Sequence, residues 1–314
     1  MNYGTLSQFN NLDIGAGDMK KLKGISHGNG YYGTSLSSLF IHNFYHGIGF
    51  FRRRGPRRAL LENTIRARNS KSEKTALIVG SGPSLDLLDP LVAKEAFDDI
   101  FAVNSYYKYE HSKYLVPDFY TLSDPNFFLE SNKVKFHENS ELYKYLEEFN
   151  PTLIIPHLNR NQIPNLPNQV LFFDDRELPR FFKGGISPLK PRGYVSLTLY
   201  KALAMAVHLG YKEIYLIGMD NSEFKSYRAN HENLVSRKSS EYFPKSLYWD
   251  DMPEFSNPEK LPGGMAGQLQ VMALFFGDLY IFPTARIFNL DENSLVDAFK
   301  KVRNHPAIKT HPEV

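Results

Sequence analysis

The sequence predicts an α/β protein, a Rossmann-like parallel sheet flanked by helices, with a lid insert and an N-terminal extension. The first observation is the apolar run from Thr75 to Leu85, which lacks the alternation of a half-exposed strand and contains the small residues Gly80–Ser84. The second is that short apolar strands alternate with helical segments further along the chain. This order gives a right-handed parallel sheet with its ligands at the carboxyl ends of the strands.

The remaining elements are predicted in chain order. Tyr194–Leu209 carries apolar residues at helical spacing and stops at Gly210, a residue typical of helix ends. A further helix is expected at Gly267–Phe276, then a strand at Leu279–Phe282 and a terminal helix near Ser294–Val302. The other expected strands are short apolar runs next to polar residues, at Ile100–Val103, Phe119–Leu122, Thr152–Ile155, Val170–Phe173 and Glu213–Ile217.

The turn from Gly80 to Ser84 is the first candidate ligand-binding element. Its glycines allow close backbone approach, Pro83 pre-sets a helical turn and Ser84 can cap it. We expect the free amides of this turn to face outward, where they would bind an anion. The spacing matches neither the dinucleotide-binding fingerprint nor the phosphate-binding loop of ATPases, so an ordinary strand-to-helix turn is the alternative.

Polar residues directly follow four of the predicted strands. They are Ser81, Asn104, Asp124 and Asp220. One such residue is ordinary turn chemistry, but four at equivalent positions would gather at the carboxyl edge of a parallel sheet. The sequence therefore predicts a binding site along this edge.

Composition limits the classes of function. The chain has no cysteine, which excludes disulfides and thiolate metal sites and permits a reducing cytoplasm. Its net charge of +3 is too small to suggest a nucleic-acid partner. The segment of about 221–262 is polar, irregular and rich in aromatic residues, including the single tryptophan, Trp249. We interpret it as a lid over the site, with a disordered loop as the alternative.

Residues 1–74 are expected to form an extension to a domain of residues 75–314. Its first 34 residues are loop-like, and the apolar segment Leu36–Phe51 is too short to span a membrane. Seven arginines follow between Arg52 and Arg68, opposed only by Glu62. This pattern predicts contact with an anionic membrane surface, and the alternative is a linker whose apolar patch packs on the main domain.

Four segments, in order, resemble bacterial lipooligosaccharide sialyltransferases of glycosyltransferase family 42 and the related polysaccharide-cluster proteins and motility accessory factors. They are Gly80–Leu85, Asn104–Tyr107, Ser123–Phe128 and Leu209–Asp220, and the likeness covers about Thr75–Val302. The resemblance implies a GT-A-variant Rossmann-like domain. It also implies inverting transfer, without metal or other cofactor, from a cytidine monophosphate (CMP) conjugate of a nonulosonate, a nine-carbon acidic sugar, to an acceptor hydroxyl.

The same resemblance assigns substrate-binding residues. Gly80, Ser81, Gly82 and Ser84 would lie against the nucleotide, and Asn104 matches an asparagine that contacts the donor. Asp124 stands where the sialyltransferases have an asparagine, which puts the identity of the donor sugar in doubt. Tyr227 matches a tyrosine that holds the phosphate, although its companion is Asn221 here.

The catalytic base is the largest departure from the family. Its sialyltransferases place a histidine near a His-Tyr sequence in the lid, whereas Ser236–Tyr242 contains none. His231 is the only lid histidine, and imidazole suits the role because its pKa lies near the working pH. The carboxylates of Asp220, Glu241 and Asp124 are the alternatives. A solvent-exposed bystander is the other interpretation of His231.

Cations are expected to stabilise the departing phosphate or the sugar carboxylate. The candidates are Arg192 and the lid pair Arg237 and Lys238, and the alternative is that each is an exposed, solvated side chain. Tyr242 is counted among the substrate-binding residues. Manganese-dependent glycosyltransferases normally carry an Asp-x-Asp motif, and none occurs in this chain. We therefore expect no metal.

These inferences predict a transferase of capsule polysaccharide or lipopolysaccharide assembly, working at the cytoplasmic face of the inner membrane on a glycan or glycolipid acceptor. A homo-oligomer is also expected. Two other functions stay open. One is a pyrophosphokinase of the pterin type, which would need ATP and magnesium, and the other is a non-catalytic nucleotide-sugar-binding subunit of a polysaccharide assembly complex.

Overall fold

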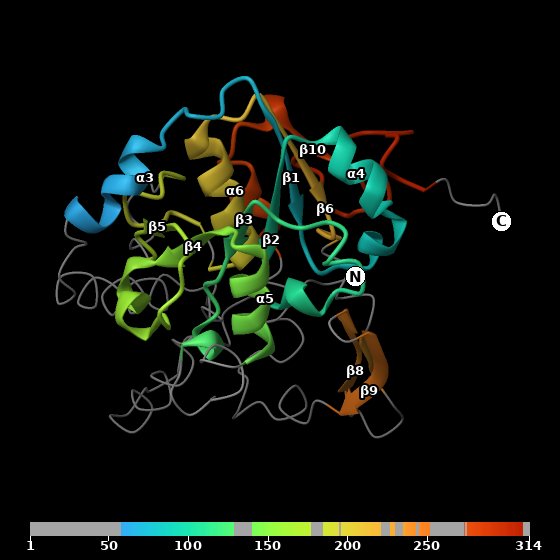
Figure 1. Ribbon diagram of the computed structural model, residues 1–314. Helices are drawn as coiled ribbons and strands as arrows, with labels where there is room; N and C mark the ends of the chain where they lie inside the picture. Colours follow the sequence, from blue (N-terminus) through green and yellow to red (C-terminus); the bar gives the residue numbers. More distant parts are fainter. Residues whose placement is uncertain are drawn as a thin grey trace, which may run out of the picture.

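The computed structural model describes residues 58–128, 140–176, 185–194, 196–220, 273 and 275–309, and the backbone alone of residues 227–229, 235–242 and 245–251. Its centre is an eight-stranded sheet in the order β11-β10-β6-β1-β2-β3-β4-β5 (Figure 1). Every neighbouring pair in it is parallel. The predicted Rossmann-like α/β fold class is confirmed.

All six strands predicted up to Ile217 are present with nearly the predicted ends. The strands of the sheet are β1 (Thr75–Val79), β2 (Asp99–Val103), β3 (Phe119–Thr121), β4 (Thr152–Pro156), β5 (Val170–Phe173), β6 (Glu213–Ile217), β10 (Ile287–Asn289) and β11 (Lys300–Lys301). The chain runs outward from β1 to β5, then returns to place β6 on the other side of β1. The carboxyl ends of β1 and β6 therefore form the topological switch point, where such sheets bind ligands.

Helices cover both faces of the sheet. On one face α6 (Thr198–Leu209) crosses β1, β2 and β3, and it ends at Gly210 with a left-handed φ of +89°. It begins four residues later than predicted. On the opposite face lie α4 (Pro90–Ala96) and α5 (Glu141–Phe149), each begun by a side-chain cap from the preceding residue.

The strand β1 shows why the sequence lacks alternation here. Ala76 and Ile78 belong to the apolar cluster beneath α6, whereas Leu77 and Val79 belong to the cluster beneath α4 and α5. All four side chains are fully buried. A strand covered on both faces must be apolar at every position, as β1 is.

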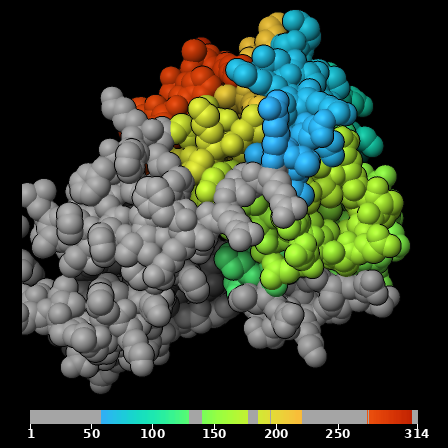
Figure 2. Space-filling view, turned by 90° about the vertical axis from the view of Figure 1, so that its left-hand side faces the viewer, coloured from blue at the N-terminus to red at the C-terminus, as the bar shows by residue number. Residues whose placement is uncertain are grey.

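The first described residues, 58–66, pack onto the outer strand β5, and the amides of Asn69 and Lys71 then donate to the His208 and Leu209 carbonyls at the end of α6 (Figure 2). The helix α3 (Glu62–Arg66) lies on β5, and Thr64 Oγ donates to the Phe172 carbonyl at 2.7 Å. This contact covers an edge strand that would otherwise offer its backbone to another chain. The proposed boundary at Thr75 stays a prediction, and the apolar segment Leu36–Phe51 lies outside the described residues. No helix within the described ranges is long and apolar enough to span a membrane.

Two predictions near the carboxyl end are wrong. Residues 275–279 are helical, so Leu279–Phe282 is not a strand, and β10 lies further on at Ile287–Asn289. Ser294–Val302 is not a helix. It is irregular up to β11, whose residues Lys300–Lys301 pair with β10. Ser294 Oγ donates to the Met219 carbonyl at 2.8 Å, and Lys301 Nζ donates back to the Ser294 carbonyl at 2.6 Å.

Within the expected lid the backbone forms a second sheet, for which the sequence analysis predicts no strand. It is three-stranded and antiparallel, in the order β7 (Tyr227–Ala229), β8 (Val235–Tyr242) and β9 (Lys245–Asp251). That this segment acts as a lid stays a prediction.

We expect Gly80→Ala to destabilise the protein by about 1–3 kcal/mol, because a Cβ at Gly80 would lie 2.3 Å from the Gly218 carbonyl oxygen and 2.6 Å from Leu199. Urea unfolding measures the change. Gly185→Ala is the matched control, since a Cβ there meets nothing within 4 Å, and its effect should stay within about 0.5 kcal/mol. Equal effects of the two substitutions would contradict the packing argument.

Candidate functional site

The turn after β1 is bound to the end of β6. The amide of Gly80 donates to the Ile217 carbonyl and that of Gly82 to the Gly218 carbonyl, both at 2.8 Å. The amide of Ser84 donates to Asp220 Oδ1 at 3.0 Å. The expectation that these amides face outward is therefore wrong, because the two neighbouring strands continue their pairing beyond their ends. That Gly80–Ser84 lies against a nucleotide stays a prediction.

Asp220, a candidate base, is buried beneath this turn. Its side chain lies beside the carboxyl of Asp291, and Ser84 Oγ accepts a hydrogen bond from the Gly218 amide at 2.9 Å in the same place. Burial, and then Asp291, raise the pKa of Asp220 to about 7, against the hydrogen bonds from Ser84 that lower it. Near neutral pH this carboxyl is thus divided between its protonated and ionised forms.

Asn104 is placed by the end of β2 and adopts a left-handed φ of +47°. Its Nδ2 donates to Thr198 Oγ1 at 3.0 Å, and Thr198 Oγ1 also lies 2.7 Å from Ser123 Oγ. The backbone carbonyl of Asn104 accepts a hydrogen bond from the Tyr120 hydroxyl at 2.7 Å. One polar chain thus joins the ends of β2 and β3 to the first turn of α6.

Ser123 and Thr198 were not among the predicted site residues. Ser123 lies in a segment that the family resemblance includes, one residue before the predicted Asp124, so that segment was the available signal. Asp124 itself caps the short helix Pro125–Phe127, accepting from the Asn126 amide at 2.9 Å. No comparable signal in the sequence marks Thr198, which only the fold brings to Asn104.

Buried polar atoms without a hydrogen-bond partner gather at this edge of the sheet. Within the described part of the chain there are six, on Asn104, Thr121, His157, Asn168, Asp220 and Asn289. All except the atom on Asn168 belong to the last residue of a strand or to residues that follow a strand's carboxyl end. Because buried polar groups are normally paired, this clustering indicates an edge built for a polar ligand.

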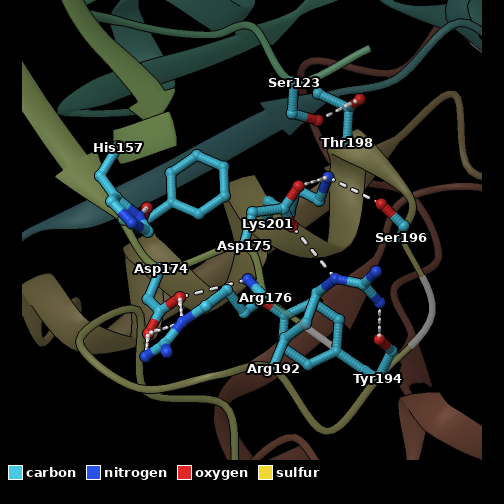
Figure 3. A network of polar contacts seen from close by, with 11 residues as sticks. Ser123, His157, Asp174, Asp175, Arg176, Arg192, Tyr194, Ser196, Thr198 and Lys201 are labelled. Carbon is cyan, nitrogen blue, oxygen red and sulfur yellow. Dashed lines mark hydrogen bonds and ion pairs between the residues drawn. The ribbon is translucent and has the colours of Figure 1, made fainter. Parts of the chain in front are cut away.

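A buried charged network lies next to it (Figure 3). Asp175 accepts from Lys201 Nζ at 2.9 Å through one oxygen and from Arg192 Nε at 3.1 Å through the other. Lys201 also donates to Ser196 Oγ at 2.9 Å, and Arg192 donates to the Tyr194 carbonyl. Burial lowers the pKa of Lys201, while Asp175 opposes the change. Arg192, predicted to bind substrate, is thus largely occupied inside the protein.

His157 follows β4 in the same region and is 3% exposed. Its Nδ1 lies 3.2 Å from the Phe173 carbonyl, which can only accept, so Nδ1 carries the proton and Nε2 presents a lone pair. Burial lowers the pKa of His157, which keeps the ring neutral at pH 7. Sequence reasoning missed this residue, since a single histidine after a strand carries no distinctive pattern.

The remaining predicted residues belong to the segment 221–262. His231 lies outside the described residues, as do the side chains of Tyr227, Arg237, Glu241 and Tyr242. In the backbone register Tyr227 pairs with Arg237. The proposed roles of all five stay predictions. No group of three or more His, Cys, Asp or Glu residues in the described ranges is placed to hold a metal ion.

A family model described as "6-hydroxymethylpterin diphosphokinase MptE-like" matches residues 56–225, more than half of the chain. The chain belongs to the MptE-like family. The match spans the strands from β1 to β6 with the polar residues at their carboxyl ends, and it stops just after Asp220. It agrees with the predicted kinship to the motility accessory factor group.

Solved structures similar to this MptE-like chain include two glycosyltransferases. The MAf glycosyltransferase of Magnetospirillum magneticum AMB-1 is 16% identical over 77% of this chain, with a TM-score of 0.37, and this chain spans 37% of it. The sialyltransferase CstII of Campylobacter jejuni, with the substrate analogue CMP-3FNeuAc, is 18% identical over 73% of this chain and 85% of its own, with a TM-score of 0.35. No curated protein sequence matches.

We expect Asp175→Asn to cost about 3 kcal/mol of folding stability, because it leaves two buried cations, Lys201 and Arg192, without their carboxylate. Lys201→Met should cost clearly less, since Asp175 keeps Arg192 and a desolvated ammonium is removed. Denaturant unfolding of both variants measures the difference. A larger loss for Lys201→Met would contradict this description of the network.

Proposed function

We propose that this MptE-like protein is an inverting, metal-independent glycosyltransferase. Its donor is a CMP-nonulosonate, and its acceptor is a hydroxyl of a surface polysaccharide or lipooligosaccharide. The observation that supports this best is the polar edge at the carboxyl ends of the strands, where Asn104, Ser123 and Thr198 form one chain. Asn104 and Ser123 stand in the ordered segments that resemble the sialyltransferases.

Asn104 is suited to orient the donor. Its Nδ2 is held by Thr198, so Oδ1 keeps a fixed direction, and this oxygen has no partner among the described residues. An amide oxygen accepts a hydrogen bond from a ribose hydroxyl or a cytosine amino group. Because the neighbouring turn uses its own amides, we assign nucleotide contact to the ends of β2 and β3 and the start of α6.

The reaction requires a base. The acceptor hydroxyl gives its proton to that base as its oxygen attacks the anomeric carbon, while the bond from that carbon to the CMP phosphate breaks and CMP leaves. Asp220 would have to leave Ser84 and Asp291 to take part. We therefore favour the lid residues His231 and Glu241 as the base, with Tyr227 and Arg237 stabilising the departing phosphate.

The cellular setting completes the proposal. The enzyme would work on the cytoplasmic side of the inner membrane, with the apolar segment Leu36–Phe51 and the arginines after it against anionic lipid. A lipid-linked glycan would then reach the site from the membrane surface. A homo-oligomeric assembly is part of this proposal.

The donor assignment predicts that CMP raises the melting temperature by several degrees at saturating concentration, whereas UMP and GMP do not. Asn104→Ala should weaken CMP binding about tenfold, because one oriented hydrogen bond is lost. Asn63→Ala, an exposed asparagine on α3, is the control and should bind as the wild type does. Failure of every cytidine nucleotide to stabilise the protein would overturn the donor assignment.

The family description favours a second candidate, a pyrophosphokinase of the pterin type. Such an enzyme transfers diphosphate from ATP and requires magnesium held by acidic ligands. A chelator distinguishes the two reactions. Sugar transfer should persist in excess EDTA, whereas a pyrophosphokinase would lose its activity and recover it with Mg²⁺.

The third candidate, a non-catalytic subunit that binds a nucleotide sugar, is tested with the same materials. CMP binding without turnover of CMP-nonulosonate, in the presence of glycan acceptors, would favour it. Turnover that survives His231→Ala, Glu241→Ala and Asp220→Ala separately would instead show that all three base candidates are wrong.

A further inference from the structure

Three segments meet at Asp220: the loop after β1, the end of β6 and the segment after β10. Asp220 Oδ1 accepts from the Ser84 amide at 3.0 Å, and the Asp220 carbonyl accepts from the Leu295 amide at 3.1 Å. Ser84 Oγ accepts from the Gly218 amide at 2.9 Å. The Asp220 carboxyl therefore holds the Ser84 end of the loop, beside the backbone bonds by which Gly80 and Gly82 are held to the end of β6.

The second oxygen of Asp220 has an unusual neighbour. Oδ2 lies so close to Gly82 that a Cβ on that glycine would be 1.8 Å away. It has no hydrogen-bond donor among the described residues, and the ionisable group that acts on it is the carboxyl of Asp291. Asp220 is 8% exposed and Asp291 is 4% exposed. Two neighbouring buried carboxylates repel each other, so this arrangement is most stable while Asp220 is protonated.

We propose that Asp220 and Asp291 form a proton-dependent latch. While the pair holds a proton, it fixes the loop Gly80–Ser84 against the end of β6 and the segment after β10. When the pair loses that proton, the repulsion between the two carboxylates loosens the loop.

The surrounding charges do not relieve this repulsion. The loop after β1 contributes Ser84, which has no charge, and β11 contributes Lys301, whose ammonium donates to the carbonyls of Glu292 and Ser294. Burial and Asp291 raise the pKa of Asp220 to about 7, against the lowering effect of Ser84. The proton is therefore lost in the range where cytoplasmic pH varies.

The sign of the pH dependence follows from the two states. In an opened loop the carboxyl of Asp220 would have an ordinary pKa of about 4. The closed loop thus binds the proton more tightly than the open loop does. The free energy that favours the closed loop therefore decreases as the pH rises from about 4 through 7. Protection of the loop amides should fall about tenfold from pH 5 to 6, more gently from 6 to 7, and level off above 7.

Amide hydrogen exchange measured by NMR tests the latch. The probes are the amides of Gly82 and Ser84. Their exchange rates are measured from pH 5 to 8.5 and divided by the intrinsic rates at each pH, which gives protection factors. In Asp291→Asn the amide group can donate to Asp220 and replace the proton, so protection should stay constant over this range. The control is Asp89→Asn, which removes a carboxyl from the α4 cap, where asparagine caps equally well, and should keep the wild-type profile.

A wild-type protein whose loop protection is constant from pH 5 to 8.5 would overturn the proposal. So would an Asp291→Asn variant that keeps the wild-type fall. If that variant does not fold, Asp220→Asn makes the same comparison, and the carboxyl ¹³C shift of Asp220 in the wild type must titrate near pH 7. None of these measurements uses a donor, so failure of the latch is distinct from failure of the proposed glycosyl transfer.

Discussion

The close approach of the backbone after β1 to the backbone after β6 is the constraint on which the rest of the structure depends. A Cβ at Gly80 would lie 2.3 Å from the Gly218 carbonyl oxygen, and one at Gly218 would lie 2.6 Å from the Gly80 carbonyl. Gly218 also has a φ of +71°, which other residues rarely adopt. Only glycine at both positions lets the two central strands continue their hydrogen bonding beyond the sheet.

This contact uses the backbone amides at the place where such sheets usually bind a ligand. A doubly wound sheet normally binds its ligand at the switch point, here between β1 and β6. In this chain that point is filled by the protein's own amides and by the buried Asp220. Among the described residues, unpaired polar atoms remain on Asp220 at this point and on Asn104 and Thr121 at the next two strands.

The amino and carboxyl ends of the strands differ in how completely their buried polar groups are hydrogen-bonded. At the amino edge, buried Asp99 is paired with Lys71 at 3.1 Å and accepts from the Tyr211 hydroxyl at 2.8 Å. Asp118 accepts from the Ile100 amide at 2.8 Å. These acidic groups serve packing, because each is satisfied by a neighbour within the fold. Among the described residues, five of the six unsatisfied buried atoms lie at the carboxyl edge, and this is the observation on which the proposed binding site rests.

The sequence was sufficient for the six strands up to Ile217 but not for β10, β11 or the contacts of the site, because those depend on residues far apart in the chain. The strands up to Ile217 are buried on both faces or end at small residues, so local composition marks them. Ser294–Val302 is predicted to be a helix, but it is held by Met219 and by the pairing of its residues Lys300–Lys301 with β10, contacts that local sequence does not reveal. Likewise, Arg192 looks like a free cation until Asp175, 17 residues earlier, is found against it.

The charges of a CMP-nonulosonate limit which residues can meet it. Both the phosphate and the sugar carboxylate are anionic. The buried cations Lys201 and Arg192 already pair with Asp175, so they would attract these anions only weakly. Asp124, on the same edge, adds a negative charge. If such a donor binds at Asn104, its compensating cations must come from elsewhere. The strand β8 carries two adjacent cations, Arg237 and Lys238, in the segment that the sequence predicts to close over the site.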